Sequence, residues 1–405
     1  MFSTLSGNNE KIIVEAKEEK EDVIVAKGGK KVGRKILLIV LGMTAFSLAL
    51  LWYRLRMDVS GSIEGGIIYL EASDNSSFAI TEDNTLWAWG GARGNIGWPL
   101  IEGITSSRRP VLIMEDVMSV SVSGGSAYKM VITSDGTLWG WGWNREGQLG
   151  DGGTRGTLEP IAIKESVVAV SAGGSHVMAI TEDGTLWAWG RNNHGQLGDG
   201  TEEDQLIPIP VKEGVIMVSA GGNHTMAITE EGVLWAWGRN RNGQLGDGTN
   251  HNSLTPISIM ENISTVSAGS SYTMAIDNEG VLWAWGIGLH GNLGDGTGND
   301  HLIPIPIMDN ISNVSAKLAH TMAIDKDGVL WAWGANDHGR LGIGSDEDDY
   351  PTPIRVKENI AAVSVGGNHT IALDKDGVLW AWGNNYFGHL GDGTRRNRHS
   401  PVRVR

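Results

Sequence analysis

Short apolar stretches separated by glycine recur along most of this chain. In the clearest unit, apolar residues 215–218 lead into small residues 219–222, and further apolar stretches cover residues 224–228 and 233–237. These stretches are too short for ordinary helices, contain β-branched and aromatic residues, and are bounded by glycine. The pattern therefore predicts three short strands in each unit.

Turn signals connect these predicted strands. A carboxylate-glycine pair separates the second strand from the third, where a tight hairpin needs a residue that accepts positive φ. The pairs are Asp135-Gly136, Asp183-Gly184, Glu231-Gly232, Glu279-Gly280, Asp327-Gly328 and Asp376-Gly377. An apolar run punctuated by proline, such as residues 207–211, follows later in most units and predicts a fourth strand. Because proline cannot donate to a central ladder, these prolines indicate strand ends or sheet edges.

The tetrapeptide Trp-x-Trp-Gly shows that the units form a repeat array. Its seven copies begin at Trp87, Trp139, Trp187, Trp235, Trp283, Trp331 and Trp380, with spacings of 52, 48, 48, 48, 48 and 49 residues. A unit of this size cannot bury its own apolar face and must stack on its neighbours. Seven units of four antiparallel strands, with no predicted helix, predict an all-β fold: a seven-bladed β-propeller over residues 67–405.

The two ends of the array suggest how the ring closes. The first unit starts at Ile67 without a preceding proline-containing strand, whereas the chain ends with one at residues 400–404. We therefore expect the C-terminal strand to complete the first blade, which would remove a free sheet edge.

The recurring residues resemble a known family. Gly221-Gly222-Asn223-His224-Thr225, followed by Trp237-Gly238-Arg239-Asn240 and then Gly243-Gln244-Leu245-Gly246, is similar to the regulator of chromosome condensation repeat. The resemblance covers all seven units, roughly residues 67–405, and the first unit is the most divergent. It implies a seven-bladed propeller.

The resemblance does not assign a role, because relatives of this fold include an exchange factor for a small GTPase, an ultraviolet photoreceptor and secreted β-lactamase inhibitors. The exchange factor uses a long insertion as a wedge, for which the nearly uniform spacing leaves no room. The photoreceptor has tryptophan two residues before the histidine, where Gly222 and Gly367 stand here. Of these three kinds of relative, the secreted inhibitors are the most similar to this chain, because they too carry short loops and are extracytoplasmic.

An uncharged run precedes the repeats. Residues 36–53 are long enough to span a bilayer as a transmembrane helix. Basic side chains crowd its N-terminal side, and only Arg54 and Arg56 follow it closely, so the positive-inside rule predicts a cytoplasmic tail at 1–35. A linker at 54–66 would then lead to an extracytoplasmic propeller. A cleaved signal peptide with a small-x-small site at residues 47–49 is the alternative.

Charge separates the two parts of the chain. Residues 1–56 hold ten of the 32 basic and six of the 47 acidic side chains, which leaves 22 basic and 41 acidic in the remainder, a formal charge of −19. Such a domain repels nucleic acid, so we expect no nucleic-acid partner. The chain has no cysteine, which excludes disulfides and thiol chemistry.

Most recurring side chains are better explained by structure than by chemistry. The two tryptophans of each motif share a sheet face, which favours packing between blades over ligand stacking. Histidine recurs at one position, at His176, His224, His320 and His369, but tyrosine or serine replaces it in other units, so hydrogen bonding within the blade is favoured over metal ligation. The Asp-Gly loops lack calcium-loop spacing and indicate turns.

The loop after Trp-x-Trp-Gly varies most and is the predicted partner-binding region. Aromatic residues and arginine are enriched at protein interfaces. The candidates are Trp98, Trp143, Arg145, Arg191, Arg239, Arg241, Tyr386 and Phe387. If the first, second and seventh units are adjacent, Trp98, Trp143, Tyr386 and Phe387 gather in one sector. Local packing within each loop is the alternative.

These observations predict a membrane-anchored, extracytoplasmic module that binds another protein. No nucleophile with a credible base is visible, so we expect no catalytic residues, cofactor or metal. The alternatives are an inhibitor or regulator of a secreted cell-wall enzyme and, with less support, a guanine nucleotide exchange factor.

Overall fold

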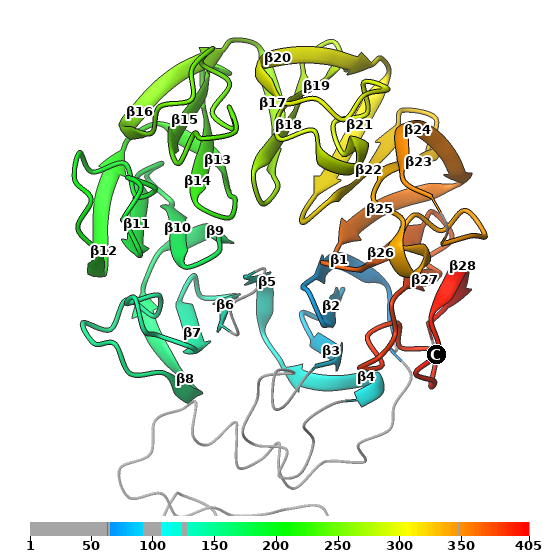
Figure 1. The fold of residues 1–405 in the computed structure, drawn as a ribbon. Helices are drawn as coiled ribbons and strands as arrows, with labels where there is room; N and C mark the ends of the chain where they lie inside the picture. The colour runs from blue at the N-terminus through cyan, green and yellow to red at the C-terminus, as the bar shows by residue number, and fades with distance from the viewer. Residues whose placement is uncertain (1–62, 64, 92–106, 124–127, 347, 405) are drawn as a thin grey trace, which may run out of the picture. The chain divides into compact units, whose positions relative to one another are not determined.

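The computed structural model describes residues 63, 65–91, 107–123, 128–346 and 348–404. These residues form seven four-stranded antiparallel sheets arranged as a ring of blades (Figure 1). The prediction of an all-β, seven-bladed propeller is confirmed. The ring lies in the compact unit Val59–Arg405.

Each blade consists of four consecutive strands. Blades 1 and 2 contain β1 (Ile67–Ala72), β2 (Ser76–Thr81), β3 (Leu86–Gly90), β4 (Ser107–Met114), β5 (Val117–Val122), β6 (Tyr128–Thr133), β7 (Leu138–Gly142) and β8 (Thr157–Lys164). Blades 3 and 4 contain β9 (Val167–Ala172), β10 (His176–Thr181), β11 (Leu186–Gly190), β12 (Gln205–Lys212), β13 (Val215–Ala220), β14 (His224–Thr229), β15 (Leu234–Gly238) and β16 (Ser253–Met260). Blades 5 and 6 contain β17 (Ile263–Ala268), β18 (Tyr272–Asp277), β19 (Leu282–Gly286), β20 (His301–Met308), β21 (Ile311–Ala316), β22 (His320–Asp325), β23 (Leu330–Gly334) and β24 (Tyr350–Lys357). Blade 7 contains β25 (Ile360–Val365), β26 (His369–Asp374), β27 (Leu379–Gly383) and β28 (Arg398–Arg403).

Sequence order within a blade runs from the centre of the ring to its rim. The first strand of each blade lies at the centre, and the fourth lies outermost (Figure 1). The prolines predicted at sheet edges, such as Pro208 and Pro304, lie on these outermost strands. The predicted hairpin glycines also have positive φ, for example 75° at Gly232.

The predicted closure by the C-terminal strand is wrong. β28 pairs with β27 in the last blade, and β4 already completes the first. The ring closes through side-by-side contacts, because the Ala72 amide donates to Ser364 Oγ at 2.9 Å and Gly393 N donates to Arg108 O at 2.9 Å. The seam between blades 7 and 1 therefore repeats bonds found between other blades, such as Ala220 N to Ser171 Oγ at 2.9 Å.

The apolar core lies between neighbouring blades, as the tryptophan pattern predicted. Trp237 is fully buried among residues of blades 3 and 4, and its indole Nε1 donates to the Gln196 carbonyl of blade 3 at 3.0 Å. Trp235, two residues earlier, lies beneath the ammonium of Lys212, 3.8 Å from its ring centre. Burying an indole of about 200 Å² contributes on the order of 5 kcal/mol, so each seam is a substantial part of the stability.

The recurring histidines are structural, but they bond between blades instead of within one. His176 Nε2 lies 3.0 Å from Thr225 Oγ1 of the next blade, and His224 Nε2 lies 3.1 Å from Thr273 Oγ1. Where tyrosine replaces histidine, Tyr272 OH of blade 5 donates across the corresponding seam to the His320 carbonyl of blade 6 at 2.8 Å. The side chain at the histidine position therefore links one blade to the next by a hydrogen bond.

Helical structure in the described residues is limited to two single-turn 3₁₀ segments, η1 (Leu289–Gly291) and η2 (Asp337–Gly339). No helix in this part of the chain has the length and apolarity to span a membrane. The predicted span at residues 36–53, the tail at 1–35 and most of the linker at 54–66 lie outside the described residues.

Candidate functional site

The variable loops project from one face of the ring. His224 at the start of β14 pairs with Gly238 at the end of β15, so the turn at residues 221–223 and the loop after Gly238 leave the blade from the same end. The same pairing recurs in the other blades. We call this surface, with the loops of blades 2 to 7 that the structure describes, the loop face.

Recurring polar residues hold most of the described loops rigid. In blade 3, the Asn192 carboxamide accepts from Leu197 N at 3.0 Å and donates to Asp199 Oδ1 at 2.9 Å. Asp199 also accepts from Thr201 N at 2.9 Å. The Asp-Gly loops are therefore turns, as predicted, and their carboxylates are engaged within the loop. No group of three metal-ligating side chains occurs among the residues that the structure describes.

Outward-pointing positions of these rigid loops hold the predicted partner-binding residues. In blade 2, Trp143 is 51% exposed and the Arg145 guanidinium lies 4.7 Å from its ring centre. In blade 7, Tyr386 is 70% exposed and stacks edge-on against Phe387 at 4.8 Å between centroids. Rigid, exposed aromatic side chains lose little conformational entropy on binding, which suits them to an interface.

A second group lies on blades 3 and 4. Arg191, Arg239 and Arg241 lie close enough to His194 that they act with its burial to lower the pKa of that imidazole. Burial is the larger cause, and the three positive charges add to it. The structure therefore brings these three predicted arginines together.

The predicted gathering of Trp98, Trp143, Tyr386 and Phe387 in one sector of the ring stays a prediction. Blades 7, 1 and 2 are successive in the ring, so Trp143 and Tyr386 flank blade 1 on either side. Trp98, which would lie between them, falls in residues 92–106, outside the described part of the chain.

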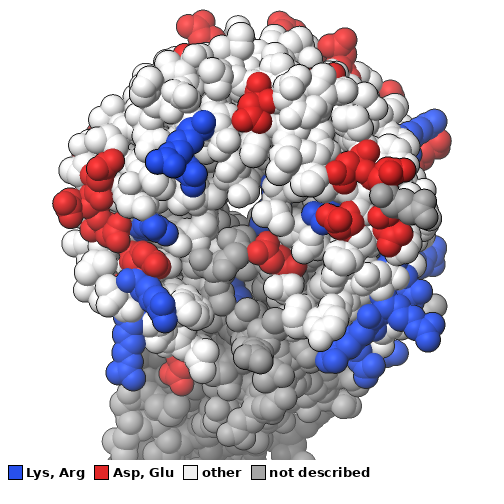
Figure 2. Space-filling model, viewed as in Figure 1, with Lys and Arg blue, Asp and Glu red and all other residues white. Residues whose placement is uncertain are grey.

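Sequence reasoning missed a basic cluster where the last blade meets the first. Figure 2 shows Lys and Arg side chains gathered over β4 and β28. Gly393 in the blade 7 loop lies beside Arg109 of β4, which places the arginines of both segments side by side. This cluster, the basic seam, comprises Arg108, Arg109, Arg395, Arg396 and Arg398. Of these, Arg398 is paired with Asp392 at 2.7 Å.

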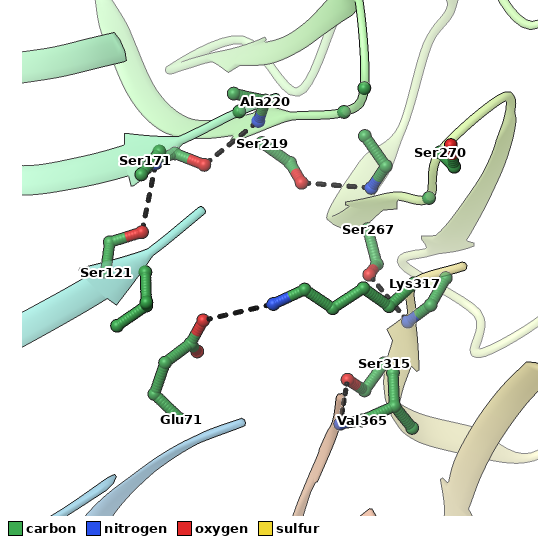
Figure 3. A pocket seen from close by; sticks show the side chains of 18 of the residues that line it. Glu71, Ser121, Ser171, Ser219, Ala220, Ser267, Ser270, Ser315, Lys317 and Val365 are labelled. Carbon is green, nitrogen blue, oxygen red and sulfur yellow. Dashed lines mark hydrogen bonds and ion pairs between the residues drawn. The ribbon is translucent and has the colours of Figure 1, made fainter. Parts of the chain in front are cut away.

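A channel of about 350 Å³ runs at the centre of the ring, lined by the inner strands. One serine from each of six inner strands lines it and accepts a backbone N–H from the next blade, as Figure 3 shows for Ser171 and Ser315. These serines are Ser121, Ser171, Ser219, Ser267, Ser315 and Ser364. The serine ring thus joins neighbouring blades around the axis.

Two charged residues interrupt this pattern and meet each other. Glu71 replaces the serine in blade 1, and Lys317 replaces the glycine that follows the inner strand in most other blades. Lys317 Nζ donates to the Ala72 carbonyl at 2.7 Å and lies 3.7 Å from Glu71 Oε1 (Figure 3). Burial raises the pKa of Glu71, and the positive charge of Lys317 opposes that rise. The repeat alignment could have revealed both residues as exceptions.

Comparisons with known proteins agree with this architecture. The model of the RCC1-like domain matches residues 54–316, and that of the regulator of chromosome condensation (RCC1) repeat matches residues 327–373 and 376–405. The human regulator of chromosome condensation is 34% identical over 85 residues, which are 21% of this chain and 20% of that protein. The Arabidopsis thaliana ultraviolet-B receptor UVR8 is 44% identical over 43 residues, 11% of this chain and 10% of that protein. The chain thus spans at most about a fifth of these relatives.

Solved structures show the same fold. Human WBSCR16 superposes with a TM-score of 0.71 at 21% identity, covering 79% of this chain and 94% of that one. Prp20p from Saccharomyces cerevisiae superposes with a TM-score of 0.70 at 21% identity, covering 88% and 89%. The repeat motifs, the ring of seven blades and the family matches together show that this chain belongs to the RCC1-like family of regulator of chromosome condensation repeat proteins.

Proposed function

We propose that this propeller is a protein-binding module whose partner docks on the loop face. The observation that carries the proposal is the exposure of Trp143 and Tyr386 on loops that their own hydrogen bonds hold rigid. The recurring tryptophans and histidines are already used between the blades, whereas these two side chains are turned toward solvent. Exposed aromatic anchors supported by neighbouring arginines are typical of protein interfaces.

Charge supports a protein partner over nucleic acid. The domain carries a strong net negative charge, which repels polyanions at long range. Arg108, Arg109 and Arg396 of the basic seam and the arginines around His194 supply local sites for carboxylates, for which the planar guanidinium is well matched. Relatives give the same kind of support, since yeast Prp20p is described for its binding to Gsp1p and histones and for its complex with Kap60.

The proposed location is outside the cell membrane, with residues 36–53 as the anchor and the N-terminus in the cytoplasm. The uncharged run and the basic residues before it support this topology. Protease added to intact cells is expected to degrade the propeller and spare a tag at the N-terminus. Degradation of the tag with an intact propeller would reverse the orientation, and full protection of both would place the whole chain inside.

Affinity capture tests the binding role. The full-length protein in mild detergent serves as bait beside a Trp143→Ser, Tyr386→Ser variant, which should fold because both side chains are exposed. The matched control is Leu158→Ser, which removes an equally exposed apolar side chain from the outermost strand β8. We expect a partner that the wild type and the control retain and the loop variant loses.

Retention of every partner by the loop variant would refute the loop face as the docking site. The captured protein also decides between roles. A secreted cell-wall enzyme whose activity falls on binding would make the propeller an inhibitor, and a small GTPase whose nucleotide release accelerates would make it an exchange factor.

A further inference from the structure

A β-bulge occurs at the start of the inner strand in every blade. In β13 the pairing passes from Val215↔Thr229 to Met217↔Ile228, so Ile216 has no partner on β14. The same shift is present in the other six blades. A bulge re-aims the side chain of the extra residue, here away from the seams between blades.

The bulged residues of blades 1 to 4 differ in size and polarity from those of blades 5 to 7. In blades 1 to 4 they are large, apolar and more than half exposed: Ile68 at 56%, Met118 at 56%, Val168 at 55% and Ile216 at 57%. In blades 5 to 7 they are small: Ser264, Ser312 and Ala361. The two serines fold back onto the neighbouring strand, as in the 3.0 Å bond from Ser264 Oγ to the Ile276 carbonyl. We call the four large residues the bulge crescent.

The bulge crescent lies on the face opposite the loop face, beside the hairpin turns. Val215 N donates to the Gly184 carbonyl of the preceding blade's hairpin at 3.0 Å, and Val167 N donates to Gly136 O at 2.9 Å. Val117 N donates in the same way to the Asn84 carbonyl at 2.8 Å, so the bulged residues of blades 2 to 4 come directly after such amides. The inner strands of blades 1 to 4 contact one another in succession, so the four side chains follow one arc around the channel.

Acidic side chains border this arc. The hairpin turns of blades 1 to 4 expose Glu82, Asp83, Asp135, Asp183, Glu230 and Glu231. The hairpins of blades 6 and 7 differ, because each carries a lysine. Lys326 Nζ donates to the Glu279 carbonyl at 2.9 Å, and Lys375 Nζ donates to Asp327 O at 3.3 Å. The large apolar bulges therefore lie on four blades whose hairpins carry carboxylates and no lysine.

We propose that the bulge crescent is a second docking surface, which binds a basic amphipathic helix of a partner protein. Aliphatic side chains of this size favour burial, and these four are not used in the packing of the described residues. A helix presents apolar anchors at intervals of three and four residues, and lysine or arginine on its flanks would meet the bordering carboxylates.

Charge selects this occupant over two others. Anionic lipid headgroups would be repelled by the acidic border, which disfavours a membrane surface. A second copy would place the same carboxylates against each other, because a two-fold contact brings identical patches together. A basic helix satisfies both the apolar arc and its border. This surface is separate from the loop face.

The test uses the full-length chain and a fluorescently labelled 18-residue peptide with leucine on one helical face and lysine on the other. Binding is followed by anisotropy for wild type and for a Met118→Ser, Val168→Ser, Ile216→Ser variant, with the fold checked by circular dichroism. Ala361→Ser changes the corresponding bulge outside the crescent, and Tyr386→Ser reports on the loop face. A scrambled peptide of equal charge controls for attraction to the acidic domain.

We expect the triple variant to bind the peptide at least tenfold more weakly, and the scrambled peptide to bind the wild type at least tenfold more weakly. Both control variants should bind like the wild type. Equal binding by the triple variant and the wild type would overturn the proposal. A dimer abolished by the triple variant, or binding to phosphatidylcholine vesicles that the peptide does not compete with, would assign the surface to another occupant and also overturn it.

Discussion

Acid should destabilise this propeller through its buried histidines, well above the pH at which its carboxylates titrate. His176, His224, His320 and His369 are fully buried, and each places Nε2 within hydrogen-bond distance of a hydroxyl of the next blade. Burial lowers the pKa of His176 to about 4 and that of His224 to about 3. Burial also lowers the pKa of His320 and His369.

The size of the effect follows from these shifts. Because the pKa of each histidine is lower in the folded chain, the unfolded chain binds protons first as the pH falls. The histidines therefore leave the free energy of unfolding undiminished above about pH 6.5, and it decreases as the pH drops toward their pKa values in the folded state. At about 1.4 kcal/mol per pH unit, His176 and His224 each contribute about 3 kcal/mol of loss by pH 4, and His224 reaches about 5 kcal/mol only below pH 3. Since a domain has only about 5–15 kcal/mol of stability, these two residues could unfold it between pH 6.5 and 4.

Urea unfolding followed by tryptophan fluorescence at several pH values measures this loss. Wild type is compared with His224→Gln, whose side chain can still reach the Thr273 hydroxyl but does not titrate. We expect the variant to be somewhat less stable at pH 7.5. Between pH 6.5 and 4, its free energy of unfolding should fall less steeply by about 1.4 kcal/mol per pH unit, the slope for one proton.

Identical slopes for the two proteins would refute the reasoning, as would a free energy of unfolding that stays constant from pH 7 to 5. The carboxylates are common to both proteins, so their contributions cancel in the difference between the two slopes. The pKa of Asp183, for example, is lowered below its ordinary value of 3.8, chiefly by the hydrogen bond from Thr181, so its contribution is lost only at lower pH.

Two further predictions concern the axis of the ring. Gly222→Ala would place a Cβ 2.5 Å from the Ser270 carbonyl oxygen of the next blade and should lower stability by about 1–3 kcal/mol, whereas Gly298→Ala, whose nearest neighbour atom is 3.9 Å away, should leave the melting temperature nearly unchanged. Lys317→Met leaves Glu71 without its cation and should cost about 1–3 kcal/mol at pH 7, more than Glu71→Gln; equal melting temperatures for the two would contradict the role of the ion pair.

The strands and seams could be predicted from the sequence because each has a local signal. Glycine after a carboxylate sets the hairpin, proline marks the outermost strand, and tryptophans two residues apart share one sheet face. The closure could not be decided in this way. The strand at 398–403 resembles every other outermost strand, and only its pairing with β27 shows to which blade it belongs.

The two surfaces differ in how visible they are in the sequence. Trp143 and Tyr386 stand out because they depart from a loop motif. Trp98 lies outside the described residues, so their grouping stays a prediction. The exposure of Ile216 could not be predicted, because this residue lies inside an apolar run that is typical of a buried strand. Periodicity cannot reveal a bulge, which reverses the direction of one side chain without changing the pattern of residue types.

The assignment of four consecutive strands to each blade has a consequence for synthesis on the ribosome. Each blade can form its hydrogen bonds as soon as its own residues have emerged, because none waits for a strand from the far end of the chain. The first blade must then hold one apolar side open until the seventh is made, when Leu70 and Trp89 meet Ile371 and Leu390. The nascent chain is therefore most in need of protection from aggregation just before its last repeat is completed.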